Sequence, residues 1–289
     1  MLTGLIKTMR PKQWAKNGFL FAALIFDRKL SNFPALLTTL AGFLIFSLLA
    51  STVYIINDLY DIEADRQHPE KRTRPIASGK LPTAAAWAAV VIFLLIIFPA
   101  AYLLSKSFAV FALVYFLLNL SYSAWLKHIP LIDVLILASF YVIRVGAGVA
   151  LIQVERFSPW LYVFTTFLAL YLGIGKRRAE LMLMTENTNN RRKVLDGYTV
   201  SFLDQLISIV LTLTIFTYSL YTFSAPNLPN NYIMMLTIPF VIYGIFRYLY
   251  LVHVENHGES PEDILFSDRP LQASIVLWGL SVLAIFYFY

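Results

Sequence analysis

The sequence lacks cysteine and is poor in histidine. With no cysteine among 289 residues, a disulfide framework, a cysteine-ligated zinc or iron–sulfur site and a thiol nucleophile are excluded. The four histidines, His68, His128, His253 and His257, have no spacing that would build a zinc site. The sequence also has no Gly-rich nucleotide-binding pattern after a strand, since no strands are expected. Any catalysis must therefore use carboxylates, amides, lysines or arginines.

Charged residues are also scarce. They make up 14% of the chain, whereas hydrophobic residues make up 58%, and a water-soluble domain carries about 25% charged residues. This composition predicts a membrane protein. The formal net charge of +6 is then explained by basic residues in the cytoplasmic loops or by the binding of anionic substrates. We expect no nucleic-acid partner.

The apolar stretches recur at the length of a membrane crossing. A bilayer core about 30 Å thick needs roughly 20 apolar residues per helix. The runs lie near 17–27, 34–57, 83–104, 107–126, 130–152, 159–181, 199–223, 230–252 and 270–289. We therefore expect an all-α polytopic protein with about nine transmembrane helices in a single domain, 1–289. The first ten residues lack the apolar core of a signal peptide and are expected to form an interfacial amphipathic helix.

The basic residues set the expected orientation. Most of the 23 lysines and arginines fall on one side when the N-terminus is placed in the cytoplasm of a cell membrane. Two long inner connections, near 58–82 and 177–198, hold most of the charge. We therefore expect the chemistry at the cytoplasmic face.

An acidic motif lies at the inner end of the second crossing. It consists of Asn57, Asp58, Asp61 and Asp65. If the helix continues through it, these residues share one face, because the separations between them along the chain include three, four and seven residues. Neighbouring carboxylates repel one another, and their oxygens suit a hard cation such as Mg²⁺, or Mn²⁺ in its place. The four residues are thus candidate metal ligands. The alternative is a solvated acidic helix end that pairs with the basic residues after it.

Those basic residues form a turn with Pro75 and a Ser-Gly pair. Lys71 and Arg74 are candidate ligands of phosphate oxygens, so that carboxylates and cations together would make a diphosphate site. The alternative is that the cations enforce membrane topology and bind lipid headgroups, which suits Arg72 and Lys80 best.

The second inner loop is basic where the first is acidic. Lys176, Arg177 and Arg178 follow two glycines, and Glu180 comes next. Three cations suit a second anion that brings no metal, such as a monophosphate. Glu180 could bridge to an arginine or reach a metal. The alternative is again a topological role for the cations.

One basic residue, Arg144, falls within an expected crossing. A charge at the membrane centre costs about 2.5–3.5 kcal/mol on insertion scales, so Arg144 should face a cavity and have a partner. The alternatives are snorkelling or a structural pair with Asp133 or Glu155. Asp204 and Arg247 raise the same question. The acidic inner segment near 258–270 is expected to be a solvated connection.

The acidic motif followed by Arg74-Pro-Ile-Ala-Ser-Gly resembles the UbiA superfamily of intramembrane prenyltransferases. The resemblance implies nine helices around a central cavity, Mg²⁺ and a polyprenyl substrate. Most aromatic prenyltransferases of that superfamily carry a second Asp-rich motif on the later loop. This sequence has Lys176-Arg-Arg-Ala-Glu180 there, which argues against a second diphosphate-bound metal.

Further stretches resemble the superfamily branch that transfers phosphoribosyl groups to polyprenyl phosphates. They are 10–17, 141–146, 175–181, 238–248 and 261–269, so the resemblance covers nearly the full chain. It implies phosphoribosyl pyrophosphate and a polyprenyl phosphate as substrates, with Asp58, Asp61 and Asp65 as catalytic residues. The candidate substrate-binding residues are Lys16, Asn57, Lys71, Arg74, Arg144, Lys176, Arg177 and Glu180.

Two other functions stay open at this point. An ordinary UbiA-type enzyme would move a prenyl group from its diphosphate to an aromatic or lipid acceptor, and the basic second loop speaks against it. A transporter of anionic metabolites would need polar residues through both halves of the bundle. Both a monomer and a homo-oligomer are compatible with the sequence.

Overall fold

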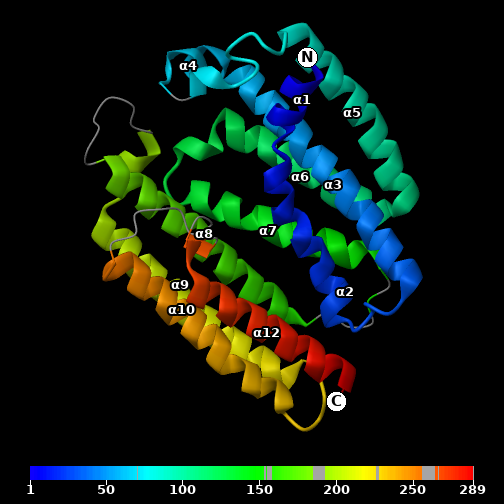
Figure 1. The fold of residues 1–289 in the computed structure, drawn as a ribbon, viewed down its shortest axis with the longest axis vertical. Coiled ribbons are helices and arrows are strands. Elements are labelled where there is room, and N and C mark those ends of the chain that lie inside the picture. The colour runs from blue at the N-terminus through cyan, green and yellow to red at the C-terminus, as the bar shows by residue number, and fades with distance from the viewer. Residues whose placement is uncertain are drawn as a thin grey trace. The chain divides into compact units, whose positions relative to one another are not determined.

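The computed structural model describes residues 1–69, 71–152, 154, 158–184, 193–225, 228–255, 264–265 and 267–288. Within these ranges all regular secondary structure is helical, and no residue is assigned to a strand. The chain divides into two compact units, coloured along the sequence in Figure 1. Unit 1 comprises Met1–Leu24, Lys29–Ala124 and Ile143–Val154, and unit 2 comprises Ile25–Arg28, Trp125–Val142 and Glu155–Tyr289.

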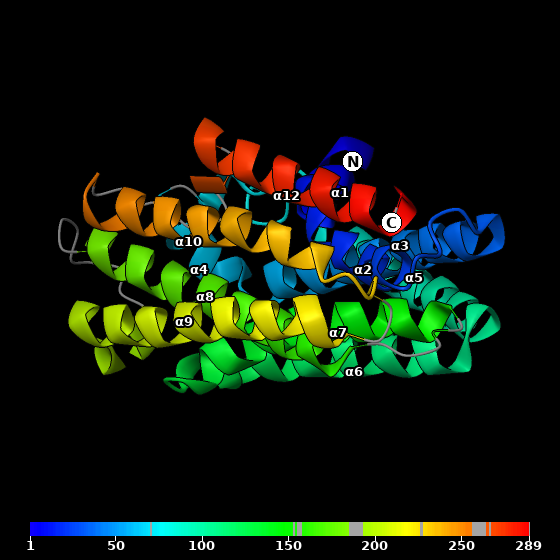
Figure 2. The same cartoon turned by 90° about the horizontal axis from the view of Figure 1, so that it is seen from below.

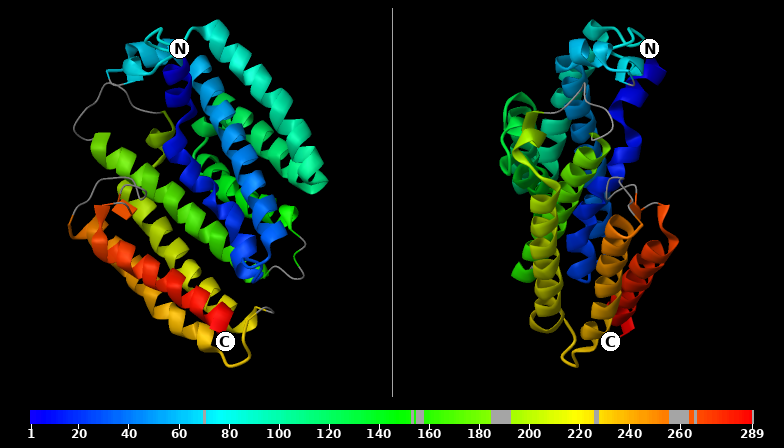
Figure 3. Two further views of the ribbon diagram at one scale, coloured as in Figure 1. Left: turned by 45° about the vertical axis from the view of Figure 1, so that its right-hand side comes forward. Right: turned by 90° about the vertical axis from the view of Figure 1, so that its left-hand side faces the viewer.

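Unit 1 is built on one long helix. Its complete elements are α1 (Leu2–Met9), η1 (Pro11–Phe21), α3 (Phe33–Tyr60), α4 (Ile62–Gln67), η2 (Lys71–Thr73), α5 (Thr83–Leu104) and α6 (Lys106–Ala124). The helix α3 packs against α1, η1, α5 and α6, and both views of Figure 3 show α1 and η1 running along it. Its first turn is capped by the Asn32 side chain, which accepts a hydrogen bond from the Ala35 N–H at 3.0 Å.

Two helices contribute to both units. They are α2 (Ala22–Phe26) and α7 (Ile132–Leu151), whose second half belongs to unit 1. There η1 approaches α7 so closely that a Cβ at Gly148 would lie 2.1 Å from the Leu20 carbonyl oxygen. Only glycine permits this approach, which holds the N-terminal segment against the bundle of unit 1.

Unit 2 consists mainly of two helix pairs. Its elements are η3 (Leu126–His128), α8 (Pro159–Met184), η4 (Lys193–Gly197), α9 (Val200–Ser224), η5 (Ile233–Thr237), α10 (Ile238–His253) and α12 (Arg269–Phe288). The helix α8 lies beside α9, and α10 lies beside α12 (Figure 2). Their core includes Tyr171, Leu203, Ile207 and Tyr248.

Seven of the described helices are long and apolar enough to cross a membrane. They are Phe33–Tyr60, Thr83–Leu104, Lys106–Ala124, Ile132–Leu151, Val200–Ser224, Ile233–His253 and Arg269–Phe288. The crossing expected near 159–181 is the 26-residue helix α8, which is not among the seven and carries four charged residues at its end. The crossing expected near 17–27 is covered by η1 and the five-residue α2. The total of nine crossings therefore stays a prediction, whereas the all-α membrane class is confirmed.

The acidic motif does not lie on one uninterrupted helix, so the condition under which its four residues would share one face is not met. The helix α3 ends at Tyr60, Asp61 has φ −90° and ψ 9°, and α4 begins at Ile62. Backbone hydrogen bonds still join the Asp61 N–H to the Asn57 carbonyl and the Asp65 N–H to the Asp61 carbonyl. The break is therefore local. Aspartate favours such a junction because its short side chain competes with the helical backbone.

Candidate active site

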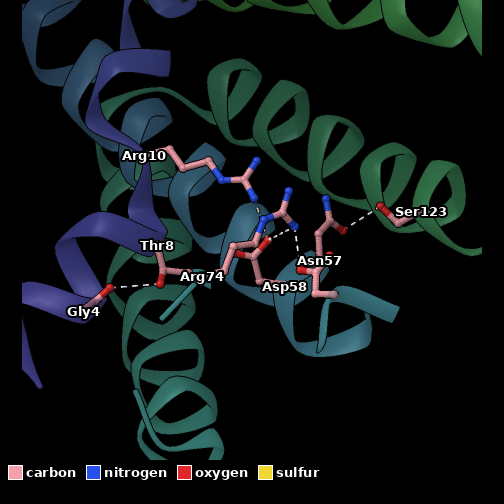
Figure 4. A network of polar contacts seen from close by, with 8 residues as sticks. Gly4, Thr8, Arg10, Asn57, Asp58, Arg74 and Ser123 are labelled. Carbon is pink, nitrogen blue, oxygen red and sulfur yellow. Dashed lines mark hydrogen bonds and ion pairs between the residues drawn. The ribbon is translucent and has the colours of Figure 1, made fainter. Parts of the chain in front are cut away.

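Two buried carboxylates of unit 1 are paired with two arginines, one of which contacts both carboxylates. Asp58 Oδ1 accepts hydrogen bonds from Arg10 Nη2 at 2.6 Å and from Arg74 Nη1 at 3.1 Å (Figure 4). The same Arg74 nitrogen donates to Asp65 Oδ2 at 2.7 Å. The side chains of Asp58 and Asp65 are only 3% and 5% exposed. We call Arg10, Asp58, Asp65 and Arg74 the carboxylate cluster.

Four chain segments bring this cluster together, and the first of them is the end of α1, where Arg10 lies. Asp58 lies in the last turn of α3, and Asp65 lies on α4. Arg74 follows η2 in a turn that is closed by hydrogen bonds from the Arg74 N–H to the Lys71 carbonyl and from the Ser78 N–H to the Arg74 carbonyl. The acidic motif and the basic turn thus meet in unit 1.

Asn57 is held by a residue that the sequence reading missed. The Ser123 hydroxyl, at the end of α6, donates to Asn57 Oδ1 at 2.6 Å (Figure 4). The amide oxygen that would serve as a metal ligand is therefore already an acceptor. In this arrangement the Asn57 amide presents its N–H groups to a ligand. A phosphate oxygen suits them, because it accepts hydrogen bonds.

The remaining members of the predicted diphosphate site lie near the ends of these elements. Asp61 is half-buried at the junction of α3 and α4, and Lys71 is half-buried at the start of η2, whereas Arg72 and Lys80 are exposed. Among the described residues, no three histidine or acidic side chains converge in a way that could hold an ion. The set of four predicted metal ligands therefore stays a prediction.

Two of the predicted ligands still suit a divalent cation. Asp58 and Asp65 direct oxygens at the same Arg74 nitrogen, so a positive charge already lies between them. Mg²⁺ is commonly bound by one or two carboxylates together with substrate phosphates and water. The pair is therefore a fitting partial site for a metal that arrives with a diphosphate.

A second polar network in unit 1 surrounds Arg144, which is 4% exposed. Its Nε donates to Asn17 Oδ1 at 2.8 Å, and its Nη2 donates to the Tyr115 hydroxyl at 3.0 Å. Asn17 is oriented in turn, because its Nδ2 donates to Ser47 Oγ at 3.0 Å. Lys16, the neighbour of Asn17, is half-buried. The interior position of Arg144 agrees with the expectation from sequence, and Glu155, one of its expected partners, lies outside the described residues.

In unit 2, Arg177 is buried between two carboxylates. Its Nε donates to Asp133 Oδ2 at 2.5 Å, and its Nη1 donates to Glu180 Oε2 at 2.6 Å. The Tyr198 hydroxyl donates to Asp133 Oδ1 at 2.6 Å and accepts from the Leu131 N–H at the same distance. Arg177 is 1% and Asp133 is 0% exposed. The arginine that we expected to face an anion is therefore part of a buried ion-pair network.

The neighbouring cation Arg178 is also paired. Its Nε donates to Asp204 Oδ1 on α9 at 2.5 Å. Acidic side chains from α7 and α9 thus neutralise two of the three cations that form a basic cluster in the sequence. The third cation, Lys176, is half-buried. Arg247, the other crossing residue in question, pairs with Asp268 at 2.8 Å. The acidic segment near 258–270 lies largely outside the described residues.

Removing the Tyr198 hydroxyl is expected to destabilise unit 2. A Tyr198→Phe variant leaves the Leu131 N–H without its acceptor and Asp133 without one donor, and a buried polar group left unsatisfied costs about 1–3 kcal/mol. Thermal unfolding in detergent measures this loss. The neighbouring Thr199→Val substitution, which removes only the side-chain cap of α9, provides a control with an expected cost of about 1 kcal/mol.

The same variant carries a pH signature. Burial raises the pKa of the Tyr198 phenol above its usual value of 10.0, and the hydrogen bond to Asp133 raises it further. Because the fold favours the protonated phenol, its stabilisation is complete below about pH 10 and is lost as the pH rises beyond that value. The stability difference between wild type and Tyr198→Phe should be constant from about pH 6 to 9 and shrink above 10. A difference that instead changes through neutral pH would contradict this assignment.

Sequence comparison identifies the family. The model of the UbiA prenyltransferase family matches residues 18–267. The decaprenyl-phosphate phosphoribosyltransferase of Mycobacterium tuberculosis is 33% identical, over 98% of this chain and 94% of the relative. The enzyme of the same name from Corynebacterium glutamicum is 31% identical, over 98% of this chain and 87% of the relative.

Solved structures show the same fold. A UbiA homolog from Archaeoglobus fulgidus bound to GPP and Mg²⁺ has a TM-score of 0.71 at 20% identity and covers 98% of this chain and 99% of that one. A UbiA homolog from Aeropyrum pernix K1 has a TM-score of 0.59 at 17% identity, over 92% and 97% of the two chains. With its apolar helices and its full-length similarity to enzymes, the chain is a multi-pass membrane enzyme that belongs to the UbiA prenyltransferase family.

Proposed function

We propose that the protein transfers the 5-phosphoribosyl group from phosphoribosyl pyrophosphate to a polyprenyl monophosphate of the decaprenyl type. The observation that carries this proposal is the similarity, over nearly the whole chain, to enzymes named decaprenyl-phosphate phosphoribosyltransferase. The residues at the end of α8 support it, because Lys176, Arg177 and Arg178 stand where a second Asp-rich diphosphate motif would otherwise be expected.

The reaction needs no general base. A phosphate monoester is already anionic at neutral pH, since its second pKa is about 6. One of its oxygens attacks the anomeric carbon of the ribose, a new carbon–oxygen bond forms, and the bond from that carbon to pyrophosphate breaks. The electron pair of the broken bond leaves with pyrophosphate. Catalysis then rests on alignment of the reactants and stabilisation of the leaving group.

We assign the pyrophosphate end to the carboxylate cluster. Asp58 and Asp65 would hold Mg²⁺, which supplies charge neutralisation of the leaving group, and Asp61 lies at the junction between them. Arg74 and Lys71 would bind phosphate oxygens. Asn57 would donate its amide hydrogens to the same group, an assignment supported by the bond between its oxygen and Ser123.

We assign the second anion to Lys176. This anion is the ribose 5-phosphate or the lipid phosphate. Lys16 and Arg144 are separate candidate substrate-binding residues of unit 1. Arg177 and Glu180 would act indirectly, by positioning Lys176. The buried pair of Arg177 with Asp133 fixes the end of α8 that carries Lys176. We further propose a cytoplasmic N-terminus and active site in the cell membrane.

A radiolabel assay tests the proposal. Purified protein in detergent is incubated with Mg²⁺, labelled phosphoribosyl pyrophosphate and decaprenyl monophosphate, and label is counted in the organic phase. We expect labelled lipid and an equal amount of released pyrophosphate. A parallel reaction contains prenyl diphosphate and an aromatic acceptor. Turnover of the prenyl diphosphate without labelled lipid would replace the proposal by an ordinary UbiA-type prenyl transfer.

A further inference from the structure

The carboxylate cluster holds as many buried negative charges as it holds arginines. Asp58 and Asp65 contribute two carboxylates, and Arg10 and Arg74 contribute two guanidinium groups that bind them directly. Figure 4 shows both arginines reaching toward Asp58 from different segments of the chain. The cluster is therefore electrically balanced by the protein itself, and a divalent cation at the same oxygens would have to compete with two resident cations.

The two kinds of partner differ in their freedom to move. The carboxylates are almost completely buried on α3 and α4, with short side chains fixed by these helices. The side chains of Arg10 and Arg74 are 32% and 29% exposed, and their long stems can swing toward water or a ligand. A buried carboxylate without a partner is costly, whereas a partly exposed guanidinium can be hydrated. When a new cation enters, the arginines should leave and the carboxylates should stay.

We propose that Arg10 and Arg74 are resident counter-ions that exchange from the carboxylates to the phosphate oxygens of the incoming substrate. Resting on the proposed function, this makes Arg10 a further substrate-binding residue beside Arg74. The exchange conserves charge, because the carboxylates trade two guanidinium groups for one divalent ion and the guanidinium groups gain the anionic phosphates. Guanidinium forks suit carboxylate and phosphate oxygens equally well.

The backbone around Arg10 supports this role. Arg10 has φ 53° and ψ 62°, in the left-handed region that non-glycine residues rarely adopt. Its N–H caps α1 by donating to the Lys7 carbonyl, and its carbonyl accepts from the Gln13 N–H in η1. The guanidinium lies 4.9 Å from the centre of the Tyr54 ring, on the same helix as Asp58. This turn directs the side chain into the cluster.

The segment on either side of Arg10 is anchored independently of its guanidinium. Trp14 Nε1 donates to Ser51 Oγ at 2.9 Å, and Ser51 Oγ donates to the Met9 carbonyl at 3.0 Å. Substitution of the Arg10 side chain therefore leaves two tethers between the N-terminal segment and α3. A variant at Arg10 can be expected to keep this segment in place and to report on the guanidinium itself.

The exchange predicts effects of opposite sign on two affinities. Removing a resident counter-ion removes a competitor, so the binary affinity for a divalent metal should rise. The same substitution removes a phosphate ligand, so the affinity for phosphoribosyl pyrophosphate should fall. Hydrogen bonds to charged groups are strong enough to change each dissociation constant by roughly tenfold. A purely structural role for the arginines predicts no gain in metal affinity.

The experiment uses the full-length protein in detergent and measures two equilibria. Free Mn²⁺ is followed by electron paramagnetic resonance without substrate, and labelled phosphoribosyl pyrophosphate is followed by equilibrium dialysis at saturating Mn²⁺. The variants are Arg10→Gln, Arg74→Gln and the charge-conserving Arg74→Lys. Arg66→Gln is the matched control, because Arg66 lies on α4 but pairs with the exposed Glu63 and donates to the Ala77 carbonyl, neither of which belongs to the carboxylate cluster.

We expect Arg10→Gln and Arg74→Gln to bind Mn²⁺ roughly tenfold more tightly than wild type and phosphoribosyl pyrophosphate roughly tenfold more weakly. Arg74→Lys should keep the wild-type Mn²⁺ affinity more closely than Arg74→Gln does, and Arg66→Gln should change neither constant. Unchanged or weaker Mn²⁺ binding in both glutamine variants would overturn the exchange. If the wild type binds Mn²⁺ but no phosphoribosyl pyrophosphate, the proposed function is refuted. The Mn²⁺ titrations still test whether the two arginines compete with the metal for the carboxylates.

Discussion

Replacing Asp133 by alanine is expected to lower the free energy of unfolding by about 3–5 kcal/mol, the cost of breaking a buried ion pair on one side. Asp133 is fully buried and accepts hydrogen bonds from Arg177 and Tyr198. Its loss would leave the Arg177 guanidinium, also buried, with one carboxylate fewer. Chemical or thermal unfolding in detergent gives the measurement. The control is Glu63→Ala, which breaks an exposed ion pair with Arg66 and should cost less than about 1 kcal/mol.

A paired substitution separates the ion pair from general packing. Apolar residues of similar volume often replace a buried ion pair without loss of stability. The double variant Asp133→Leu with Arg177→Met should therefore recover most of the stability that Asp133→Ala loses. If the double variant is less stable than the single one, packing around Asp133 rather than its charge carries the effect. Transferase activity should stay low even in a stable double variant if the pair positions the end of α8 for Lys176.

The residues that sequence reasoning found and those that it missed differ in how far apart their partners lie. Asp58, Asp65 and Arg74 come from one stretch of chain, and their spacing and charge already predicted a common site. Ser123 and Arg10 reach the same site across sequence separations of 66 and 48 residues. No periodicity within one helix reports such contacts. The stretch at residues 10–17 carries part of the family resemblance and includes Arg10, but the resemblance implied no role for that residue.

The second inner loop shows how a correct pattern can carry the wrong emphasis. Three consecutive cations at the end of α8 are a plain feature of the sequence and favour an anion site. The neutralisation of two of them, Arg177 and Arg178, depends on Asp133 of α7 and Asp204 of α9, which lie 44 and 26 residues away along the chain. Net local charge is a property of packed helices, so it became visible only in the structure.

The helices themselves were largely predictable because hydropathy and helix length follow directly from the bilayer. The runs expected near 34–57 and 83–104 agree closely with α3 and α5. The run expected near 17–27 is covered by the end of η1 and by the short α2 instead of one long helix, and it stays a predicted crossing.

Replacing Asp58 by asparagine is expected to reduce kcat/KM by about 10²–10³-fold, the usual effect of removing one preorganised electrostatic contact from an active site. Asparagine keeps the size of the side chain but removes the negative charge that two arginines and the proposed metal share. The Mg²⁺ concentration that gives half-maximal activity should rise, whereas the KM for the polyprenyl phosphate should change little. Initial rates at varied Mg²⁺ and varied lipid separate the two effects.

Glu63→Gln supplies the matched control, because this carboxylate lies on α4 close to Asp65 in sequence yet is 75% exposed and pairs only with Arg66 among the interactions resolved here. It should keep both the activity and the Mg²⁺ dependence of the wild type. A similar loss in Asp58→Asn and Glu63→Gln would mean that bulk acidity of the motif, rather than the buried cluster, supports the reaction. A loss in Asp58→Asn with an unchanged Mg²⁺ dependence would instead restrict Asp58 to the orientation of Arg10 and Arg74, because a carboxylate that binds the metal cannot lose its charge without weakening that binding.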